Sequence, residues 1–315
     1  MLRYIVGRMF SMVPALLLVS AVVFVVMRLL PGDPAVAMLG QAEASAETLA
    51  RMRQEMGLDQ PIPVQYALWI SRVAQGDLGI SVRSRVPVSV LLIQRLPVTT
   101  QLAGMSLLLG IVIAMVSAML AASRRGTWLD QCLTGGSLAG LSMPGFVLAL
   151  GMIYLFALRW RWLPPTGYVG FLEDPIQNLR LMVMPTVSLG LASAGLMMRL
   201  LRSQLLEEFG RDYVRTARAK GLVSKMVVGH HVLRNALIPF VTIVGQQAGV
   251  LLSGAVITET VFALPGMGRL IVDNVLNRDL AVVEGVVLLS AIFYLAVSLA
   301  VDLLYAVIDP QIRLT

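Results

Sequence analysis

The chain has 315 residues, of which 57% are hydrophobic and 14% are charged, and its mean hydropathy is +0.80. That much apolar side chain with so few charges exceeds what a water-soluble core needs, which argues against a soluble enzyme or carrier and for a chain embedded in lipid. The net charge of +7 does not indicate nucleic-acid binding, because basic loop ends of a membrane protein produce the same excess and no recognition motif accompanies it.

Six apolar runs are long enough to cross the hydrocarbon core of a bilayer as helices, which takes about 20 residues each. They are continuously apolar, so they predict helices rather than the alternating, shorter strands of a barrel. The predicted fold class is therefore all-α, a polytopic membrane protein with about six transmembrane helices. The runs lie at residues 9–27, 101–122, 133–158, 181–201, 236–257 and 286–307.

These runs divide the chain into three predicted segments. Residues 1–30 hold the N-terminus and the first transmembrane helix, 31–98 form an external segment, and 99–315 form a five-helix core. Arg3 and Arg8 precede the first run as they would in a signal peptide, but the run is longer than the roughly 7 to 15 residues of a signal-peptide core. We therefore expect it to remain in the protein as an uncleaved transmembrane helix.

The external segment 31–98 is predicted to contain two short helices. Charged and apolar residues mix with helical spacing over 47–56, before Gly57 and Pro61 end the pattern, and a second helix is expected at 63–73. Two roles remain open for this segment. It either caps the external face or helps to receive a protein that delivers substrate.

Polar groups inside the apolar runs are candidates for a translocation pathway, because burying an amide or hydroxyl without a partner costs about 1 to 3 kcal/mol. Gln246 and Gln247 are adjacent in the fifth run, and Ser142 precedes Pro144 and Gly145 in the third. The two amides either line a wet passage or hydrogen-bond a neighbouring helix. Pro and Gly in the third run can also serve only to bend a helix.

A basic segment at residues 210–239 separates the fourth and fifth runs and cannot lie in lipid. Its cations outnumber its one acid, Asp212; they are Arg211, Arg215, Arg218, Lys220, Lys225 and Arg234. Gly210 and Gly221 bracket a predicted helix of roughly 15 Å. Asp212 in its first turn and cations in its last turn complement the helix dipole.

One face of this short helix is predicted to contact a partner. Tyr213, Ala217 and Lys220 share that face by their spacing, and small Ala217 with Gly221 allows close approach to a cleft in another protein. Gly221 is expected to end the helix in a left-handed conformation. The alternative is a solvated helix at the membrane interface.

No enzyme chemistry is predicted for this chain. A P-loop needs Gly-Lys followed by Ser or Thr, and the only lysines, Lys220 and Lys225, follow Ala219 and Ser224. The adjacent His230 and His231 lack the spacing of helical metal ligands, and the apolar runs contain no His to activate a nucleophile. We predict no catalytic residue and no metal site, and we expect the single Cys132 to be a small core residue.

Three motifs spread over the chain resemble those of a known transporter family. The sequence reads LPGDP at residues 30–34, DYVRTARAKG and then HVLRNALIP within 212–239, and LPGMGRL at 264–270. Together they look like the dipeptide, oligopeptide and glutathione permeases. These are inner-membrane permease subunits of binding-protein-dependent ABC importers.

The wider family has a cytoplasmic loop of the pattern Glu-Ala-Ala-x3-Gly-x9-Ile-x-Leu-Pro. Aligned on Gly221, this chain keeps Ala217, Gly221 and Leu233. It departs from the pattern at four positions, since Arg215 and Thr216 stand in place of the first Glu-Ala, His231 in place of Ile and Arg234 in place of Pro. The resemblance implies that the loop 202–235 couples the chain to an ATPase. Tyr213, Ala217, Lys220 and Gly221 would then be the residues that contact it.

The resemblance also implies partners and a location. It implies a second, related permease, two cytoplasmic ATPase subunits that bind ATP in place of this chain, and an external substrate-binding protein. The protein would be a multi-pass component of the bacterial inner membrane that imports di- or oligopeptides.

Charge supports an orientation with both termini in the cytoplasm, because the spans are even in number and the basic segment favours that side. Arg159, Arg161 and Arg180 lie on the side assigned outside and oppose this assignment. The alternative function is a self-contained secondary transporter or channel, for which we find no internal repeat and no buried acidic relay. The sequence does not distinguish dipeptide, oligopeptide, glutathione or a metal chelate as cargo.

Overall fold

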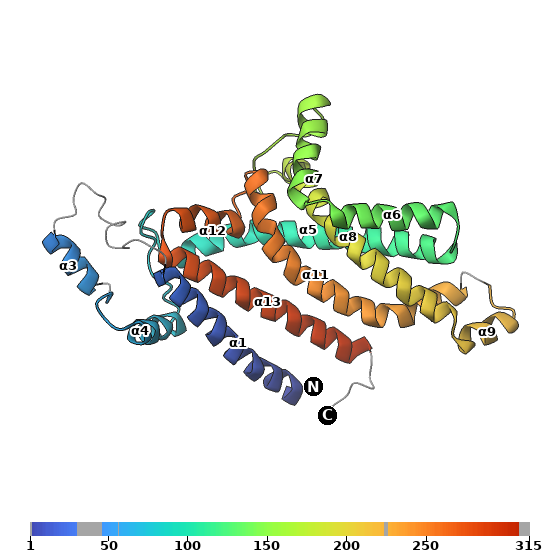
Figure 1. Cartoon of the computed structure of the whole chain (residues 1–315), viewed down its shortest axis with the longest axis horizontal. Coiled ribbons are helices and arrows are strands. Elements are labelled where there is room, and N and C mark those ends of the chain that lie inside the picture. Colours follow the sequence, from blue (N-terminus) through green and yellow to red (C-terminus); the bar gives the residue numbers. More distant parts are fainter. Residues whose placement is uncertain (1, 30–45, 56, 224–225, 309–315) are drawn as a thin grey trace. The chain divides into compact units, whose positions relative to one another are not determined.

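The computed structural model describes residues 2–29, 46–55, 57–223 and 226–308, which form helices joined by loops (Figure 1). Within these residues no strand occurs, and the one isolated antiparallel bridge joins Ile80 and Pro87. The predicted all-α class is confirmed. The LPGDP motif at 30–34 lies outside the described residues.

The helices, in chain order, are α1 (Leu2–Leu29), α3 (Ala46–Glu55), α4 (Ile62–Ala74), α5 (Val88–Ser123), α6 (Trp128–Ser142), α7 (Gly145–Met152), η1 (Ile153–Arg159), α8 (Pro175–Phe209), α9 (Asp212–Ala219), η2 (Val227–Val232), α11 (Leu233–Val261), α12 (Met267–Leu276) and α13 (Leu280–Ile308). The π-helical turns η1 and η2 directly continue or precede α-helices. The two helices predicted at 47–56 and 63–73 correspond to α3 and α4.

Five of the described helices are long and apolar enough to cross a membrane, and a bent pair brings the number to six if it counts as one span. This agrees with the prediction of about six. The third span differs from the prediction, because residues 133–158 are not one straight helix. Instead α6 and the pair α7 and η1 meet at an angle of 100°.

The break has a local cause in the Met143–Pro144 step. Proline has no N–H to donate and its ring disfavours the helical conformation in the residue before it. Met143 accordingly has φ −86° and ψ 122°, which is extended. Pro144 thus ends α6 and allows a new helix to begin at Gly145.

The chain divides into two compact units. The first unit is Met1–Val98 with Pro265–Leu295, and the second is Thr99–Leu264 with Ala296–Thr315. In the first unit Phe24 of α1 packs against Tyr66 and Trp69 of α4, with ring centroids 5.4 and 5.5 Å away. This aromatic cluster fixes the second external helix against the first membrane helix.

The second unit is built around α8. In the most apolar 18-residue stretch of α8, 72% of the chain is buried, whereas 33% is buried in the corresponding stretch of α5. α8 is therefore the inner helix and α5 is a peripheral one. Small residues permit the close packing. A Cβ on Gly190 would lie 2.9 Å from the Ser106 carbonyl oxygen of α5, and a Cβ on Gly195 would lie 2.7 Å from that of Ser137 of α6.

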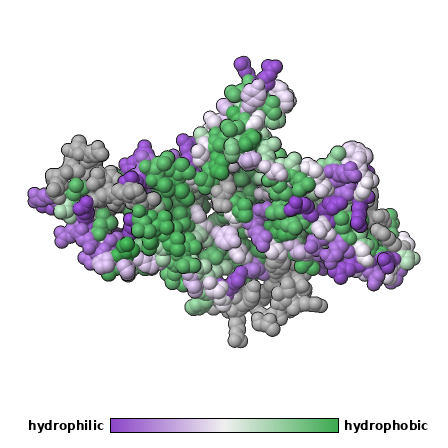
Figure 2. Space-filling view, viewed as in Figure 1, coloured by the Kyte–Doolittle hydropathy of each residue, from purple (hydrophilic) through white to green (hydrophobic). Residues whose placement is uncertain are grey.

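Apolar side chains remain exposed on the outer helices, and Figure 2 shows hydrophobic residues gathered in broad areas of the visible face. On α5 they recur at every fourth residue, which places them on one helix face; they are Leu108, Val112, Val116 and Leu120. A stripe of this kind is stable only in contact with lipid or another protein. It fits a chain that spans a membrane.

The close packing at Gly195 leads to a stability prediction. Gly195→Ala should destabilise the protein by about 1 to 3 kcal/mol, because the added methyl group forces α6 and α8 apart. Gly136→Ala on α6 is the matched control, since a Cβ there has no atom within 4 Å. The measurement is the melting temperature of each variant in detergent. Equal melting temperatures would show that this contact does not limit the packing.

Candidate functional site

The coupling loop expected at 202–235 overlaps the ends of two long helices. α8 extends to Phe209 and α11 begins at Leu233, so residues 210–232 connect them. The difference arises because Arg202, which the sequence assigned to the loop, lies inside α8 and pairs with a buried carboxylate. The connection itself contains α9 and η2.

Gly221 ends α9 as predicted. Its φ is +78°, and the N–H of Leu222 donates to the carbonyl oxygen of Ala217 at 3.3 Å. This bond spans the same positions as the longer bond of a Schellman motif, in which the glycine takes the left-handed conformation. The prediction for the end of this helix is confirmed.

The faces of α9 differ in burial. Val214 and Ala217 are buried in a core cluster with residues of α5, α8 and α11, and Tyr213 packs against that cluster. Asp212, Arg215, Thr216 and Lys220 are exposed. The small side chain of Ala217 therefore allows α9 to approach its own core, while the opposite, charged side is the surface open to a partner.

Tyr213 fastens α9 to both neighbouring helices. Its hydroxyl donates to Glu208 Oε2 of α8 at 2.5 Å and accepts from Asn235 Nδ2 of α11 at 3.1 Å. Burial, together with the hydrogen bond to Glu208, raises the pKa of Tyr213 above its usual value. The hydroxyl therefore stays protonated and remains a donor. The sequence interpretation missed Glu208 and Asn235, whose polar side chains at the span ends were the available signal.

A second anchor lies between α6 and α8. Arg202 Nε and Nη2 donate to Asp130 Oδ1 and Oδ2, each at 2.7 Å, and Asp130 is 4% exposed. Asp130 also accepts from the Gly126 N–H at 3.0 Å and from Thr134 Oγ1 at 3.4 Å. Such a two-bond pair with satisfied oxygens holds two helices in one register. The sequence interpretation did not single it out.

The predicted pathway residues lie at different depths. Gln247 is 6% exposed, whereas its neighbour Gln246 is exposed on the surface of the chain. Ser142 is exposed at the end of α6, directly before the break at Pro144.

Cys132 is exposed in α6, so the expectation of a core cysteine is wrong; α6 packs with its other faces. No group of metal-binding side chains occurs in the part of the chain that the structure describes.

Comparison with known protein families identifies this arrangement. The model of the binding-protein-dependent transport system inner membrane component matches residues 90–314, and the model of the N-terminal part of such membrane components matches residues 1–103. The chain belongs to this family. It is therefore a multi-pass inner-membrane permease of a binding-protein-dependent ABC importer, a family of transport proteins rather than enzymes. Such permeases work with an ATPase and a substrate-binding protein.

Full-length relatives support the same assignment over the self-contained secondary transporter. A putative peptide transport system permease protein of Brucella abortus (strain 2308) is 40% identical over 313 residues, which is 99% of each chain. A glutathione transport system permease protein of Salmonella paratyphi A is 41% identical over the same share of both chains. The inward-facing MetNI methionine ABC transporter is similar in fold, with a TM-score of 0.58 and 19% identity over 70% of this chain and 96% of that one.

The Asp130–Arg202 pair leads to a second stability prediction. Asp130→Asn should cost about 3 to 5 kcal/mol, because it leaves the guanidinium partly buried without its counter-charge. Glu207→Gln is the control. It breaks the pair with Arg211, whose side chains are 61% and 56% exposed, and it should cost about 0 to 1 kcal/mol. Thermal unfolding of the two variants in detergent measures the difference, and similar losses would contradict an anchoring role for Asp130.

Proposed function

We propose that this chain is the permease subunit of an importer of short peptides. The observation that supports this most strongly is the 40 to 41% identity, over 99% of each chain, to permeases named for peptide and glutathione transport. Glutathione is itself a tripeptide, so both names describe cargo with a peptide backbone and charged ends.

The proposed complex contains a second, related permease, two cytoplasmic ATPase subunits and an external substrate-binding protein. ATP is bound by the ATPase subunits and not by this chain, since neither lysine lies in a phosphate-binding loop. The stripe of exposed apolar residues on α5 provides a surface that lipid or the second permease can cover. Both termini lie in the cytoplasm in this proposal, on the side of the basic segment.

The proposed contact with the ATPase is the exposed side of α9 and its C-terminal end at Lys220 and Gly221. Tyr213 and Ala217 hold the helix from its inner side, so a displacement of α9 is passed to α8 and α11 through contacts within the chain. All four residues are predicted from the sequence to contact the partner, but Tyr213 and Ala217 lie on the inner side of α9, against the core of this chain. Two face the partner, and two fix the helix that carries them.

The test of this function is uptake by the complete complex, reconstituted in vesicles with ATP on the ATPase side. Di- and oligopeptides and glutathione are supplied with the binding protein on the other side. We expect accumulation of at least one peptide class that requires ATP. The absence of peptide accumulation by a complex that hydrolyses ATP would overturn the proposed cargo.

Gly221→Asp tests the coupling contact in the same assay. Asp and Asn both tolerate the left-handed conformation that Gly221 adopts, and a Cβ there has open space. The two variants therefore differ mainly in charge. We expect Gly221→Asp to weaken ATPase co-purification and to abolish uptake. A negative charge at the helix C-terminus is unfavourable by about 0.3 to 1 kcal/mol, and a partner surface complementary to the basic segment would repel it. Gly221→Asn is the control, and equal behaviour of both variants at equal membrane abundance would contradict a charge-sensitive contact.

Gln246 and Gln247 are proposed to line the passage, with Ser142 at the broken third span as a further polar group. Replacing both glutamines by Leu should lower uptake on the order of tenfold, the effect of about 1.4 kcal/mol, while the complex still assembles. Gln131→Leu, an exposed amide at the start of α6, is the matched control. Unchanged uptake by the assembled double variant would show that the amides only contact neighbouring helices.

A further inference from the structure

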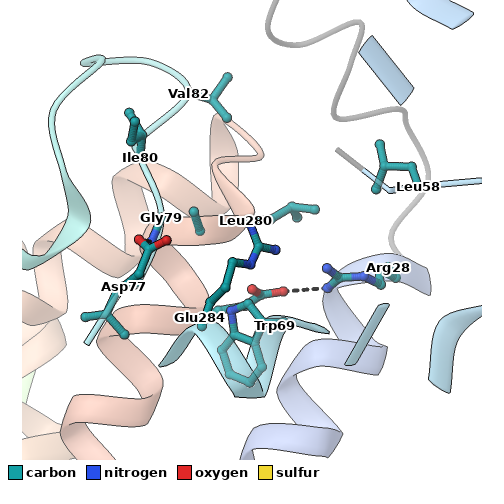
Figure 3. A pocket seen from close by; sticks show the side chains of 12 residues that line it. Arg28, Leu58, Trp69, Asp77, Gly79, Ile80, Val82, Leu280 and Glu284 are labelled. Carbon is teal, nitrogen blue, oxygen red and sulfur yellow. Dashed lines mark hydrogen bonds and ion pairs between the residues drawn. The ribbon is translucent and has the colours of Figure 1, made fainter. Parts of the chain in front are cut away.

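The first unit contains a cavity that neither the coupling helix nor the proposed passage uses. Its volume is about 210 Å³, and its walls come from the end of α1, from Leu58, from α4 with the loop that follows it, and from the start of α13. The charged and aromatic residues that line it are Arg28, Trp69, Arg72, Asp77 and Glu284. Figure 3 shows Arg28 and Glu284 pointing toward one another, with Asp77 on the other side of Glu284.

The cavity lies where two membrane helices end. Arg28 is the last residue but one of the span Gly7–Leu29, and Glu284 lies in the first turns of the span Leu280–Leu303. The ends of spanning helices lie at the level of the lipid headgroups, where Trp and Arg are favoured. Trp69 is 7% exposed in the cavity wall. Exposed large apolar side chains lie on the helices that form its walls, at Val26 and Leu29 of α1 and Leu68 of α4, and the exposed Ile80 lines the cavity itself.

The charges at the base of the cavity are already satisfied. Arg28 Nη1 donates to Glu284 Oε1 at 2.5 Å, and Arg28 Nε donates to Gln65 Oε1 at 2.9 Å. The Arg28 guanidinium also lies 3.2 Å from the centre of the Phe24 ring. This buried pair therefore shapes the cavity without leaving a net charge in it.

Two opposite charges remain available at its rim. Arg72 and Asp77 are both exposed. Within the described part of the chain the Arg72 guanidinium has no hydrogen-bond partner, although its charge acts on Glu284. Asp77 Oδ1 accepts from the Gly79 N–H at 2.9 Å, which leaves the second oxygen for a ligand. A group with one negative and one positive charge would match this rim.

We propose that this cavity binds the headgroup of a zwitterionic phospholipid of the phosphatidylethanolamine type. The phosphate contacts Arg72, the ammonium contacts Asp77, and the acyl chains lie on the exposed apolar residues of α1 and α4. The exposed apolar residues Leu68 and Ile80 match acyl chains, which a soluble dipeptide lacks.

The test uses the complete, delipidated complex in detergent, titrated with phosphatidylethanolamine or with phosphatidylglycerol, which lacks the ammonium group. Native mass spectrometry counts bound lipid, and melting temperature reports the affinity. We expect the wild type to bind phosphatidylethanolamine about tenfold more tightly than phosphatidylglycerol, as the loss of one charge-assisted contact predicts. Asp77→Asn should remove this preference, and Arg72→Gln should weaken binding of both lipids.

Matched controls are Arg51→Gln and Asp59→Asn, which neutralise exposed charges of the same segment outside the cavity. They should behave as the wild type. Size-exclusion chromatography confirms that each variant assembles, since the changed side chains are all exposed. Equal lipid binding by the wild type and both cavity variants would overturn the proposal. Displacement of bound lipid by a soluble dipeptide would also overturn the proposal and assign the cavity to cargo. Displacement of the lipid by the substrate-binding protein alone would overturn it as well and assign the cavity to docking of that protein.

Discussion

Arg202 and Asp130 form a buried ion pair between α8 and α6, and the start of the basic segment depends on it. An arginine near the end of an apolar helix would otherwise extend toward water. Here both of its hydrogen bonds are taken by a carboxylate 72 residues away in sequence, so α8 continues as a packed helix to Phe209. The connection that contains α9 therefore begins from a fixed point rather than from a flexible loop.

The attachment of α9 follows from that fixed point. Its inner face is apolar and buried, Tyr213 links Glu208 to Asn235, and Gly221 reverses the chain. A helix of eight residues is too short to be stable alone, so these contacts are what keep it helical. In the proposed complex, the same contacts would pass the movement of an ATPase to α8 and α11, because Tyr213 is hydrogen-bonded to a residue of each of these helices.

The two units meet different requirements of a membrane protein. In the second unit, glycines on α8 allow backbone contacts with α5 and α6, since helices in lipid gain little from hydrophobic burial and depend on close packing. In the first unit, polar and aromatic residues gather at the C-terminal end of α1 and the N-terminal end of α13, where lipid headgroups and water meet. The proposed lipid site is a consequence of this second arrangement.

The sequence by itself determined the number and positions of the apolar spans, the two external helices, the end of α9 at Gly221 and the family. These features follow from constraints that are local in the chain: the length needed to cross a bilayer, the backbone freedom of glycine, and short motifs. Only the tertiary structure decided that the third span bends by 100° at Met143–Pro144, since a proline in a membrane helix can also be accommodated by a small kink. It also decided that Ala217 faces inward and that Arg202 meets Asp130. Which face of a helix is buried, and which distant charge lies opposite, depends on how the helices pack against one another, and no local pattern records it.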